Sequence, residues 1–445
     1  MRRVRALGRK AGQGAIIASK RVCAPALAAS LLCASAFAQT YGPEDTEAAD
    51  VPARNVEGLP APLIDAAKKA VSQNPQVLAQ LAELAALESE LNAAKWQRAP
   101  NLSAEVLATT GGSSIADQDG LAFNVALEQP VWAGGGIGAG VDAARAGRNV
   151  GESALRQIRY DIVVGIASAY FEALTAFNRA KALEAGLADM ATLVASIERR
   201  VEREVSPAVD LVLARSRVTQ LEVDLATARE QGENALLRLQ ELVGDRLLPP
   251  VMPQGDLTGE VPIEALALDE ILGCSPALER SQREVDLASA RADVTKSALW
   301  PQLLVQLSQN ELTGARAALV LRWQSGNGLS RFAVNDAARA RVDRAIALLG
   351  QADQEARRRI SAEYVLLRSS QRRAEAGLLA FEAADALQAS YQRQFVAGRR
   401  SWLDVINAAR EKTFARVSYE TARVSAQGAA TRILALTCRW SPQGI

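Results

Sequence analysis

The pentapeptide Asp-Ala-Ala-Arg-Ala occurs twice in this chain, at Asp142–Ala146 and again at Asp336–Ala340, an offset of 194 residues. Other matches keep the same offset: Tyr170 with Tyr364, Asp210 with Asp404, Ala214 with Ala408, and Leu242 with Leu436. A constant offset that includes tyrosine and aspartate is hard to obtain by chance. The sequence therefore predicts one structural unit written twice.

The offset is 201 residues further upstream, where Pro75 and Pro100 bracket one segment and Pro276 and Pro301 bracket its counterpart. The second copy is therefore seven residues shorter between its prolines and its pentapeptide. We expect the extra length of the first copy in Thr109–Gly120, because its Gly, Ser, Thr and Asp residues favour loops.

Two long segments, 137–203 and 330–397, lack proline and are rich in residues that favour helix. A helix of that length would be roughly 100 Å long and has to pack along similar helices as a coiled coil. Turns near Val205–Pro207 and Ala397–Ser401 are expected to send the chain back.

Strands are predicted between the first two helices of each copy, because apolar and polar residues alternate there with period two. The apolar rows are Leu102–Ala108, Leu121–Leu127, Leu303–Leu307 and Ala317–Trp323, and the polar positions are Glu105, Asn124, Glu128, Gln306, Arg316 and Arg322. Four strands leave two open edges, whereas three copies would supply twelve strands and close a barrel. Two solvent-exposed hairpins on a helical protein are the alternative.

Residues 1–38 are predicted to be a cleaved signal peptide. Seven basic residues and no acidic one accompany an apolar stretch from Val22 to Ala36, and Ala36-Phe37-Ala38 fits a cleavage site. An N-terminal membrane anchor is the alternative, which Pro25 disfavours. Residues 39–62 are acidic and contain proline, so they are predicted to form a linker.

The composition argues against an enzyme. Apolar residues make up 49% of the chain and aromatic residues only 4%, and there is no histidine, the commonest general base and metal ligand. Neither a phosphate-binding loop nor a cysteine cluster with metal spacing is present. We therefore predict no catalytic residue, no metal site and no cofactor.

Charge and cysteine usage give further bounds. Without the signal peptide, 44 basic residues stand against 50 acidic ones, so a nucleic-acid partner is not predicted. Cys274 and Cys438 can pair in an exported protein, but the sequence leaves a disulfide and two separate thiols equally open. No run of 18 apolar residues follows the signal peptide, so no transmembrane helix is predicted.

Several motifs together resemble those of the TolC-like outer membrane efflux proteins. Ala99-Pro100-Asn101-Leu102 enters the first strand, Glu128-Gln129-Pro130-Val131-Trp132 leaves the hairpin, and Gly134-Gly135-Gly136 precedes the long helix. The segment Phe395–Val405 resembles the periplasmic tip motif of that family. The resemblance extends from about Leu63 to Trp440, and its tip segments look most like the type I secretion branch that exports adhesins.

The resemblance implies a mainly α-helical protein with a transmembrane β part. A homotrimer would form a 12-stranded barrel in the outer membrane, continuous with a periplasmic coiled-coil tunnel. The first repeat would span residues 63–250 with its hairpin at 101–131, and the second would span 251–445 with its hairpin at 302–324.

The implied function is protein export through a passive duct that docks on a periplasmic adaptor and an inner-membrane ABC transporter. The alternative is the outer membrane component of a drug-efflux assembly with a proton-driven pump. A secreted coiled-coil scaffold without a pore is a distant alternative.

The resemblance also implies a gate at the periplasmic end. Asp404 matches a ring of acids able to select cations, and Asn407 stands where relatives carry a second acid. Arg400 matches a latching arginine with Asp210 as its expected partner, and Phe395 stands where the family has a tyrosine. The plainer alternatives are a first-turn acid for Asp404 and a solvated turn residue for Arg400.

Both turns are expected to meet the adaptor. Gly398 is expected to have a positive φ, whereas Glu204 at the same place in the first copy predicts a different turn. Ser206 and Pro207 are expected to cap and begin the returning helix. The remaining tip candidates are Arg399, Ser401 and Trp402, the last either packed between helices or anchoring a partner.

Two more tryptophans are candidates for contact with lipid. Trp132 and Trp323 fall at predicted strand ends, where an aromatic belt would meet the membrane boundary. Core packing is the alternative for both residues.

Overall fold

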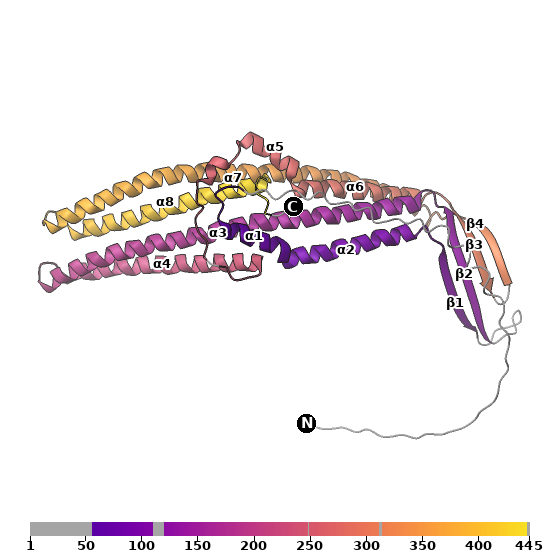
Figure 1. The fold of residues 1–445 in the computed structure, drawn as a ribbon, viewed down its shortest axis with the longest axis horizontal. Coiled ribbons are helices and arrows are strands. Elements are labelled where there is room, and N and C mark those ends of the chain that lie inside the picture. Colours follow the sequence, from indigo (N-terminus) through magenta and orange to yellow (C-terminus); the bar gives the residue numbers. More distant parts are fainter. Residues whose placement is uncertain (1–55, 110–119, 248, 311–313, 443–445) are drawn as a thin grey trace, which may run out of the picture. The chain divides into compact units, whose positions relative to one another are not determined.

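The computed structural model describes residues 56–109, 120–247, 249–310 and 314–442, in which helices and strands follow one another in two similar halves (Figure 1). The predicted signal peptide and most of the predicted linker lie outside these residues. The first half contains α1 (Ala61–Gln73), α2 (Pro75–Trp96), β1 (Asn101–Thr109), β2 (Gly120–Trp132), α3 (Gly136–Glu202) and α4 (Ala208–Val243). The second half contains a 3₁₀ turn (Leu257–Glu260), α5 (Glu264–Cys274), α6 (Pro276–Ser297), β3 (Gln302–Asn310), β4 (Gly314–Arg322), α7 (Ser330–Val396) and α8 (Trp402–Leu436).

The lengths of these elements repeat as the sequence offsets do. Helices α3 and α7 each have 67 residues, and α2 and α6 each have 22. The long helices begin and end within one residue of the predicted bounds. Ten residues separate β1 from β2 and three separate β3 from β4. The seven extra residues of the first copy therefore lie at the hairpin tip where we expected them.

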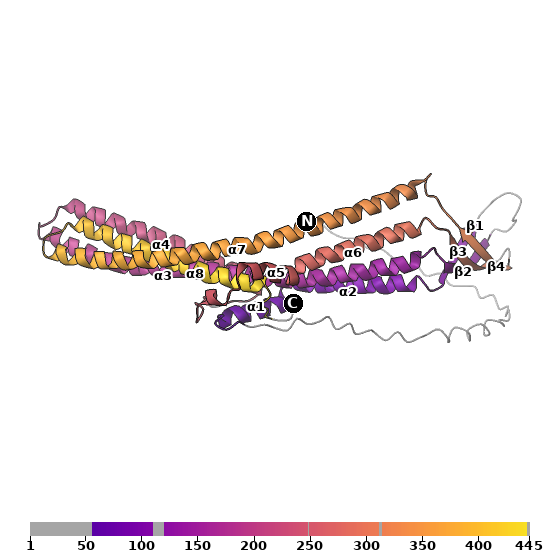
Figure 2. The same ribbon diagram turned by 90° about the horizontal axis from the view of Figure 1, so that it is seen from above.

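Each long helix packs along two shorter ones. Helix α3 lies against α2 over one half of its length and against α4 over the other, and α7 lies against α6 and α8 in the same way (Figure 2). The two halves meet through α3, which packs on both α6 and α8. Side by side, the helices therefore run α2–α3–α6–α7 near the sheet and α4–α3–α8–α7 near the helical turns.

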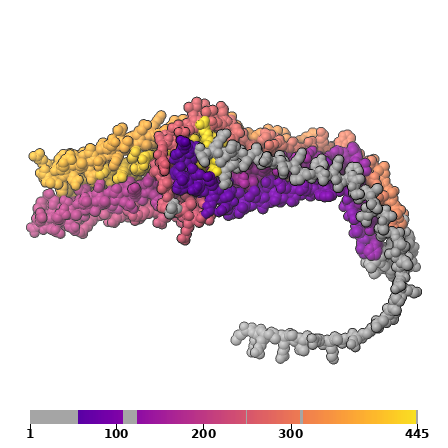
Figure 3. Space-filling view, in the orientation of Figure 1, coloured from indigo at the N-terminus to yellow at the C-terminus, as the bar shows by residue number. Residues whose placement is uncertain are grey.

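Two clusters of buried apolar side chains hold the helices together. One surrounds the middle of α3, where α1, α5 and the end of α8 gather; it includes Ile166, Tyr170, Ile271, Ile433 and Trp440. Figure 3 shows α1 in indigo beside the yellow C-terminal segment at this level. The second cluster lies toward the turns between α3, α4 and α8 and includes Leu183, Met190, Leu221, Leu225 and Ile406.

The segment that joins the two halves, residues 244–263, is held by two tyrosines related by the repeat. The Tyr170 hydroxyl donates to the Val251 carbonyl oxygen over 2.8 Å and accepts from the Val251 amide over 2.9 Å. The Tyr364 hydroxyl donates to the Pro262 carbonyl oxygen. Burial raises the pKa of each phenol to about 12, so both remain donors at neutral pH.

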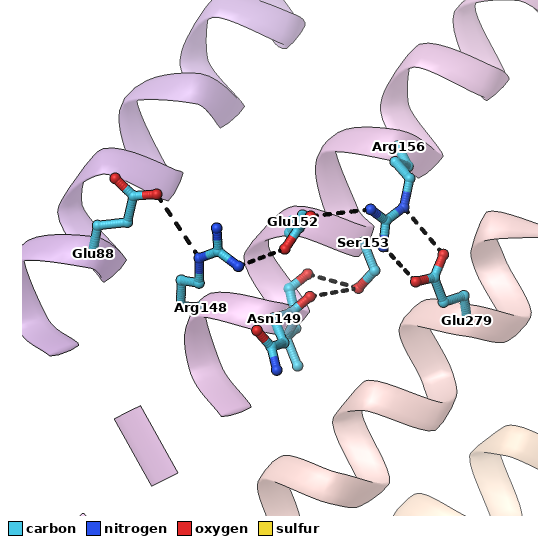
Figure 4. Close-up of polar contacts among 8 residues, drawn as sticks. Glu88, Arg148, Asn149, Glu152, Ser153, Arg156 and Glu279 are labelled. Carbon is cyan, nitrogen blue, oxygen red and sulfur yellow. Dashed lines mark hydrogen bonds and ion pairs between the residues drawn. The ribbon is translucent and has the colours of Figure 1, made fainter. Parts of the chain in front are cut away.

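A chain of ion pairs joins α2, α3 and α6 (Figure 4). Glu152 on α3 accepts from Arg148 over 2.8 Å and from Arg156 over 3.2 Å. Arg148 also approaches Glu88 of α2 at 3.8 Å, and Arg156 binds both carboxylate oxygens of Glu279 on α6. The side chains of Arg148, Glu152 and Arg156 are less than a quarter exposed. Water screens charges less at such sites, so these ion pairs are stronger than ion pairs on a fully exposed surface.

The four strands form one antiparallel sheet in the order β1-β2-β3-β4. The register sets Leu102, Leu127, Leu307 and Ala317 in one row across the sheet. The row beside it, on the opposite face, contains Asn101, Glu128, Gln306 and Ala318. Arg322 reaches Glu128 over 3.2 Å, so two of the predicted polar positions share that face. The prediction of a sheet with one apolar and one polar face is confirmed.

Helix α3 contains a window of 18 residues with a mean hydropathy of 1.2, long and apolar enough to cross a membrane. Two thirds of that window is buried against the other helices of the chain. A core helix passes the same test, so this window is weak evidence for a membrane span.

Cys274 and Cys438 form a disulfide, which settles the alternative that the sequence left open. Their Cα atoms are 6.4 Å apart, and 164 residues separate them in sequence. The bond joins the end of α5 to the residues just after α8, and Arg439 beside it binds both carboxylate oxygens of Glu270 at 2.7 and 2.9 Å. The C-terminal end of α8 is therefore fastened to α5.

Replacing Cys274 by Ser should lower the free energy of unfolding by about 2–5 kcal/mol, because the disulfide closes a long loop in the unfolded chain. Thermal unfolding of the oxidised protein, followed by circular dichroism, measures this loss. Treatment with a reductant is the control, since it should lower the wild-type midpoint and leave the variant unchanged. Equal midpoints of both oxidised proteins would contradict the prediction.

Candidate functional site at the helical tips

The predicted gate residues lie at one end of the helices, where α3 turns into α4 and α7 turns into α8, opposite the end that carries the sheet (Figure 1). We call residues 199–210 tip 1 and residues 393–404 tip 2. The two tips are copies of each other at an offset of 194. Their differences therefore show which side chains the fold itself does not require.

The two turns have the same backbone, which corrects our expectation that they differ. Glu204 has a φ of 59° and Gly398 a φ of 71°. The residue after each donates its amide hydrogen to a carbonyl oxygen five residues back, from Val205 to Arg200 and from Arg399 to Gln394, both over 2.8 Å. Glutamate thus occupies a left-handed position that glycine fills in the second copy, and its Cβ makes that conformation cost about 1–2 kcal/mol.

The caps of the returning helices do differ. The Ser401 hydroxyl accepts from the Leu403 amide over 3.1 Å and caps α8. In tip 1 the capping position is Pro207, which has no side-chain oxygen, and α4 begins at Ala208 without a side-chain cap. The prediction that Ser206 caps this helix and Pro207 begins it is therefore wrong by one position.

Arg400 contacts residues at the end of α7 and the start of α8. Its guanidinium lies 3.9 Å from the centroid of the Tyr391 ring, and its Nε lies 3.7 Å from Asp404 Oδ2. That ion pair is longer than a hydrogen bond and about 40% exposed, so on its own it contributes less than about 1 kcal/mol. Asp210, the expected partner, is not among its contacts within the described chain.

Phe395 joins the two tips. Its ring is buried, and the Arg200 guanidinium from the last turn of α3 lies 4.8 Å from its centroid. A cation over an aromatic face is worth about 0.5–1 kcal/mol at such a site. Phe395 lacks the hydroxyl of a tyrosine, but its ring still makes a contact between the two tips.

Sequence reasoning missed Arg200 and Tyr391. Tyr391 lies four residues before Phe395, so both rings share one face of α7. An aromatic pair at that spacing, opposite an arginine-rich helix end, is the signal that could have found the two residues.

The remaining tip candidates have defined positions. Asp210 and Asp404 are acids in the first turns of α4 and α8, where the helix dipole favours a negative charge. Asn407 is exposed one turn beyond Asp404, and Arg399 is exposed at the turn. Trp402 is half-buried against the cluster of apolar side chains near the tips. It therefore packs between helices and leaves only part of its ring for a partner.

At the other end of the helices, Trp132 at the end of β2 and Trp323 just after β4 are exposed. Trp96 at the end of α2 and Trp300 just after α6 are also exposed at this junction, and the sequence reasoning missed them. Four of the six tryptophans of the chain therefore lie exposed between the helices and the sheet. Core packing within the single chain does not explain these side chains.

The described residues contain no group of three or more side chains placed to hold a metal ion. The arrangement at the tips consists of exposed carboxylates, arginines and aromatic rings. Such groups can attract or repel ions and bind one another.

Among the solved structures with this fold are outer membrane proteins and channels. A crystal structure of CusC superposes with a TM-score of 0.74 at 15% identity and covers 87% of this chain and 96% of its own. VceC from Vibrio cholerae gives a TM-score of 0.73 at 16% identity, with 84% and 96% covered. CmeC from Campylobacter jejuni gives 0.73 at 13% identity, with 85% and 86% covered. At these identities the likeness shows the fold alone.

Sequence comparison points to one family. Residues 66–245 match the family described as outer membrane efflux protein. The cobalt-zinc-cadmium resistance protein CzcC of Cupriavidus metallidurans is 32% identical over 190 residues, which is 42% of this chain and 45% of that protein. The match thus spans less than half the length of this relative. The family match is confined to residues 66–245, whereas the likeness in fold to these solved structures extends over both repeats.

Replacing Glu204 by Gly should raise the free energy of unfolding, by less than about 1 kcal/mol. Relief of the left-handed strain is partly offset by the greater freedom of glycine in the unfolded chain. Replacing Gly398 by Ala should lower it by about 1 kcal/mol. Midpoints of thermal unfolding, measured by circular dichroism, should move in opposite directions for this matched pair. Shifts of the same sign would show that the two turns are not equivalent.

Proposed function

We propose that this chain is one protomer of a homotrimeric outer membrane channel for efflux. The observation that carries the proposal is the sheet, which has one apolar face, one polar face and two unpaired edges at β1 and β4. An open sheet edge is not tolerated inside a bilayer. Three copies joined edge to edge would give a closed barrel of twelve strands, with the apolar face toward lipid and the polar face toward a water-filled lumen.

The helices support the same closure. Helix α4 at one side and α7 at the other pack on partners along only part of their circumference. Their unpacked sides carry exposed apolar residues: Val209, Val212, Val223 and Leu237 on α4, and Val365, Leu379 and Val396 on α7. Apolar surface of this extent on a long helix indicates a partner. A neighbouring copy would supply it by placing its α7 against α4.

The tryptophan-rich junction fits the boundary of the membrane. Trp132 and Trp323 end the apolar rows of the sheet, where a ring with an apolar body and a polar nitrogen is favoured at the headgroup level. Trp96 and Trp300 extend this belt on the helical side. The helices would then occupy the periplasm, and the tips would form the far end of the duct.

At that far end, threefold symmetry would bring three Asp404 carboxylates together. A ring of acids attracts cations and repels anions. Its strength is limited in two ways, because Asn407 replaces a second acid and Arg400 stands beside each Asp404. The channel would be a passive conduit that makes and breaks no covalent bond. The tips would dock on a periplasmic adaptor that belongs to an inner-membrane pump.

The cargo has two candidates. The similarity to a cobalt-zinc-cadmium resistance protein favours efflux of divalent metal cations, which also suits an acidic ring. The likeness of the tip segments to the type I secretion branch favours export of a protein, for example a large adhesin. We favour metal cations as the cargo, because the chain is 32% identical to the cobalt-zinc-cadmium resistance protein over 190 residues.

Deletion of the chain from its host tests the cargo. Loss of tolerance to cobalt, zinc or cadmium, restored by the wild-type chain, would support metal efflux. Unchanged tolerance together with loss of a large protein from the culture medium would support type I secretion and reject the first candidate. A detergent-solubilised protein that sediments as a monomer would reject the channel itself.

Replacing Arg400 by Ala should raise the mean single-channel conductance in a planar lipid bilayer. The change removes the contact with Tyr391 and leaves Asp404 without its neighbouring positive charge, so the ratio of cation to anion permeability should also rise. Arg358→Ala is the matched control, because it removes an arginine from an exposed pair with Glu355 far from the tips. Unchanged conductance in Arg400→Ala would show that Arg400 does not restrict the narrow end of the channel.

A further inference from the structure

Left-handed backbone recurs at three pairs of repeat-related positions. One pair, Gly134 and Gly328, is glycine in both copies, and the other two pairs are mixed. Glu204 and Gly398 occupy the helical turns, and Gly244 and Cys438 occupy the ends of α4 and α8. Their φ angles are 59° and 71° in the first mixed pair and 77° and 54° in the second. Each mixed pair thus contains one glycine and one residue with a side chain. The fold needs the conformation at all four places, and glycine adopts it without strain.

The side chain at Cys438 has a clear use within the chain. It forms the disulfide with Cys274. The disulfide, which glycine cannot form, therefore offsets the cost of the left-handed conformation at Cys438.

Glu204 has no such use within its own chain. It is exposed at the turn of tip 1, and in the described part of the chain its carboxylate makes no hydrogen bond and no ion pair. Its amide donates to the Val201 carbonyl oxygen over 2.9 Å, a bond that glycine would make equally well. A strained residue at a functional end of a molecule, with its charge unused, indicates a contact outside the chain.

The unpacked sides of the helices indicate which surface would meet this carboxylate. Tip 1 lies on the α4 side of the chain and tip 2 on the α7 side. When copies close side by side, tip 1 of one copy comes next to tip 2 of the next. The exposed turn of tip 2 carries Arg399, which, among the residues the structure describes, has no carboxylate partner. Tip 1 carries Glu202 and Glu204, which are exposed and have the opposite charge.

We propose that Glu204 binds Arg399 of the neighbouring copy, and that this ion pair joins adjacent protomers at the end of the helices. The inference rests on the proposed trimer and assigns one of its contacts. It also explains why tip 1 keeps glutamate in a conformation that favours glycine. The pair lies outside the contacts of Arg400, so it is a separate restraint on the tips.

A charge-reversal cycle tests the pair. Glu204→Arg and Arg399→Glu should each lower the temperature at which the detergent-solubilised trimer dissociates, because each places like charges together. The double variant should recover most of the loss. Additive losses in the double variant, or no loss in either single variant, would overturn the proposal. Glu204→Arg keeps a Cβ at the left-handed position, so backbone strain is the same as in the wild type.

The variant Glu204→Gly is an independent test, because two measured temperatures should change in opposite directions. It should raise the unfolding midpoint of the chain and lower the dissociation temperature of the trimer. If the variant assembles as firmly as the wild type but fails in efflux by cells, the carboxylate serves another protein and the proposal is wrong. If the wild-type protein itself forms no trimer, the channel proposal fails, which separates that failure from the failure of this contact.

Cross-linking gives a direct measure of proximity. Glu204→Cys combined with Arg399→Cys, treated with a short bis-maleimide, should give species of two and three copies on denaturing gels. Cys274 and Cys438 are paired with each other and do not react. Cys23 and Cys33 lie in the predicted signal peptide, so the experiment uses the chain from residue 39 onward. Glu204→Cys combined with Arg358→Cys is the matched control and should stay at the mass of one copy. Linkage within single chains only would overturn the proposal.

Discussion

The close packing of α3 against α8 holds the two repeats together, and the positions of the tips and the sheet depend on it. The helices approach closely because small residues lie at the interface. A Cβ at Gly186 of α3 would overlap the Thr413 side chain, and one at Gly428 of α8 would come within 2.9 Å of the Phe171 Cβ. Lys412 of α8 adds ion pairs to Asp189 of α3 and Asp385 of α7, at 2.9 and 2.8 Å. One helix of the second repeat is thus fixed between the long helices of both.

This packing explains how chemistry at the tips can be shared between repeats that are distant in sequence. Arg200 ends α3 and Phe395 ends α7, yet the guanidinium lies over the ring because α8 holds both long helices in line. The individual contacts at the tips are weak, each worth at most about 1 kcal/mol. Contacts of this size can be exchanged for others at little cost, so the tips can rearrange when a partner binds them.

The two copies of the repeat have diverged where the side chains are used differently. Cys438, which follows α8 and has left-handed backbone, forms the disulfide, whereas the matching position after α4 is Gly244. The tips show the reverse, with glycine in the second copy and glutamate in the first. A residue with a Cβ is strained at such positions. Where one occurs, its side chain therefore makes a contact that glycine could not make. Comparison between copies of one chain therefore separates what the backbone requires from what the function requires.

The sequence by itself determined the duplication, the lengths of the helices, the alternating strands and the place of the seven additional residues, because these follow from local periodicity and from spacing along the chain. It also indicated the conformation of Gly398, since few other residues adopt a positive φ without strain. Only the tertiary structure decided that Cys274 and Cys438 meet, that Glu204 takes the same conformation as Gly398, and that Arg400 lies against Tyr391 and Asp404. The local geometry of each turn sets the last two outcomes, whereas the disulfide depends on the distance between segments 164 residues apart. Such distances are set by how helices pack, and helix packing is a property of surfaces that the one-dimensional pattern does not contain.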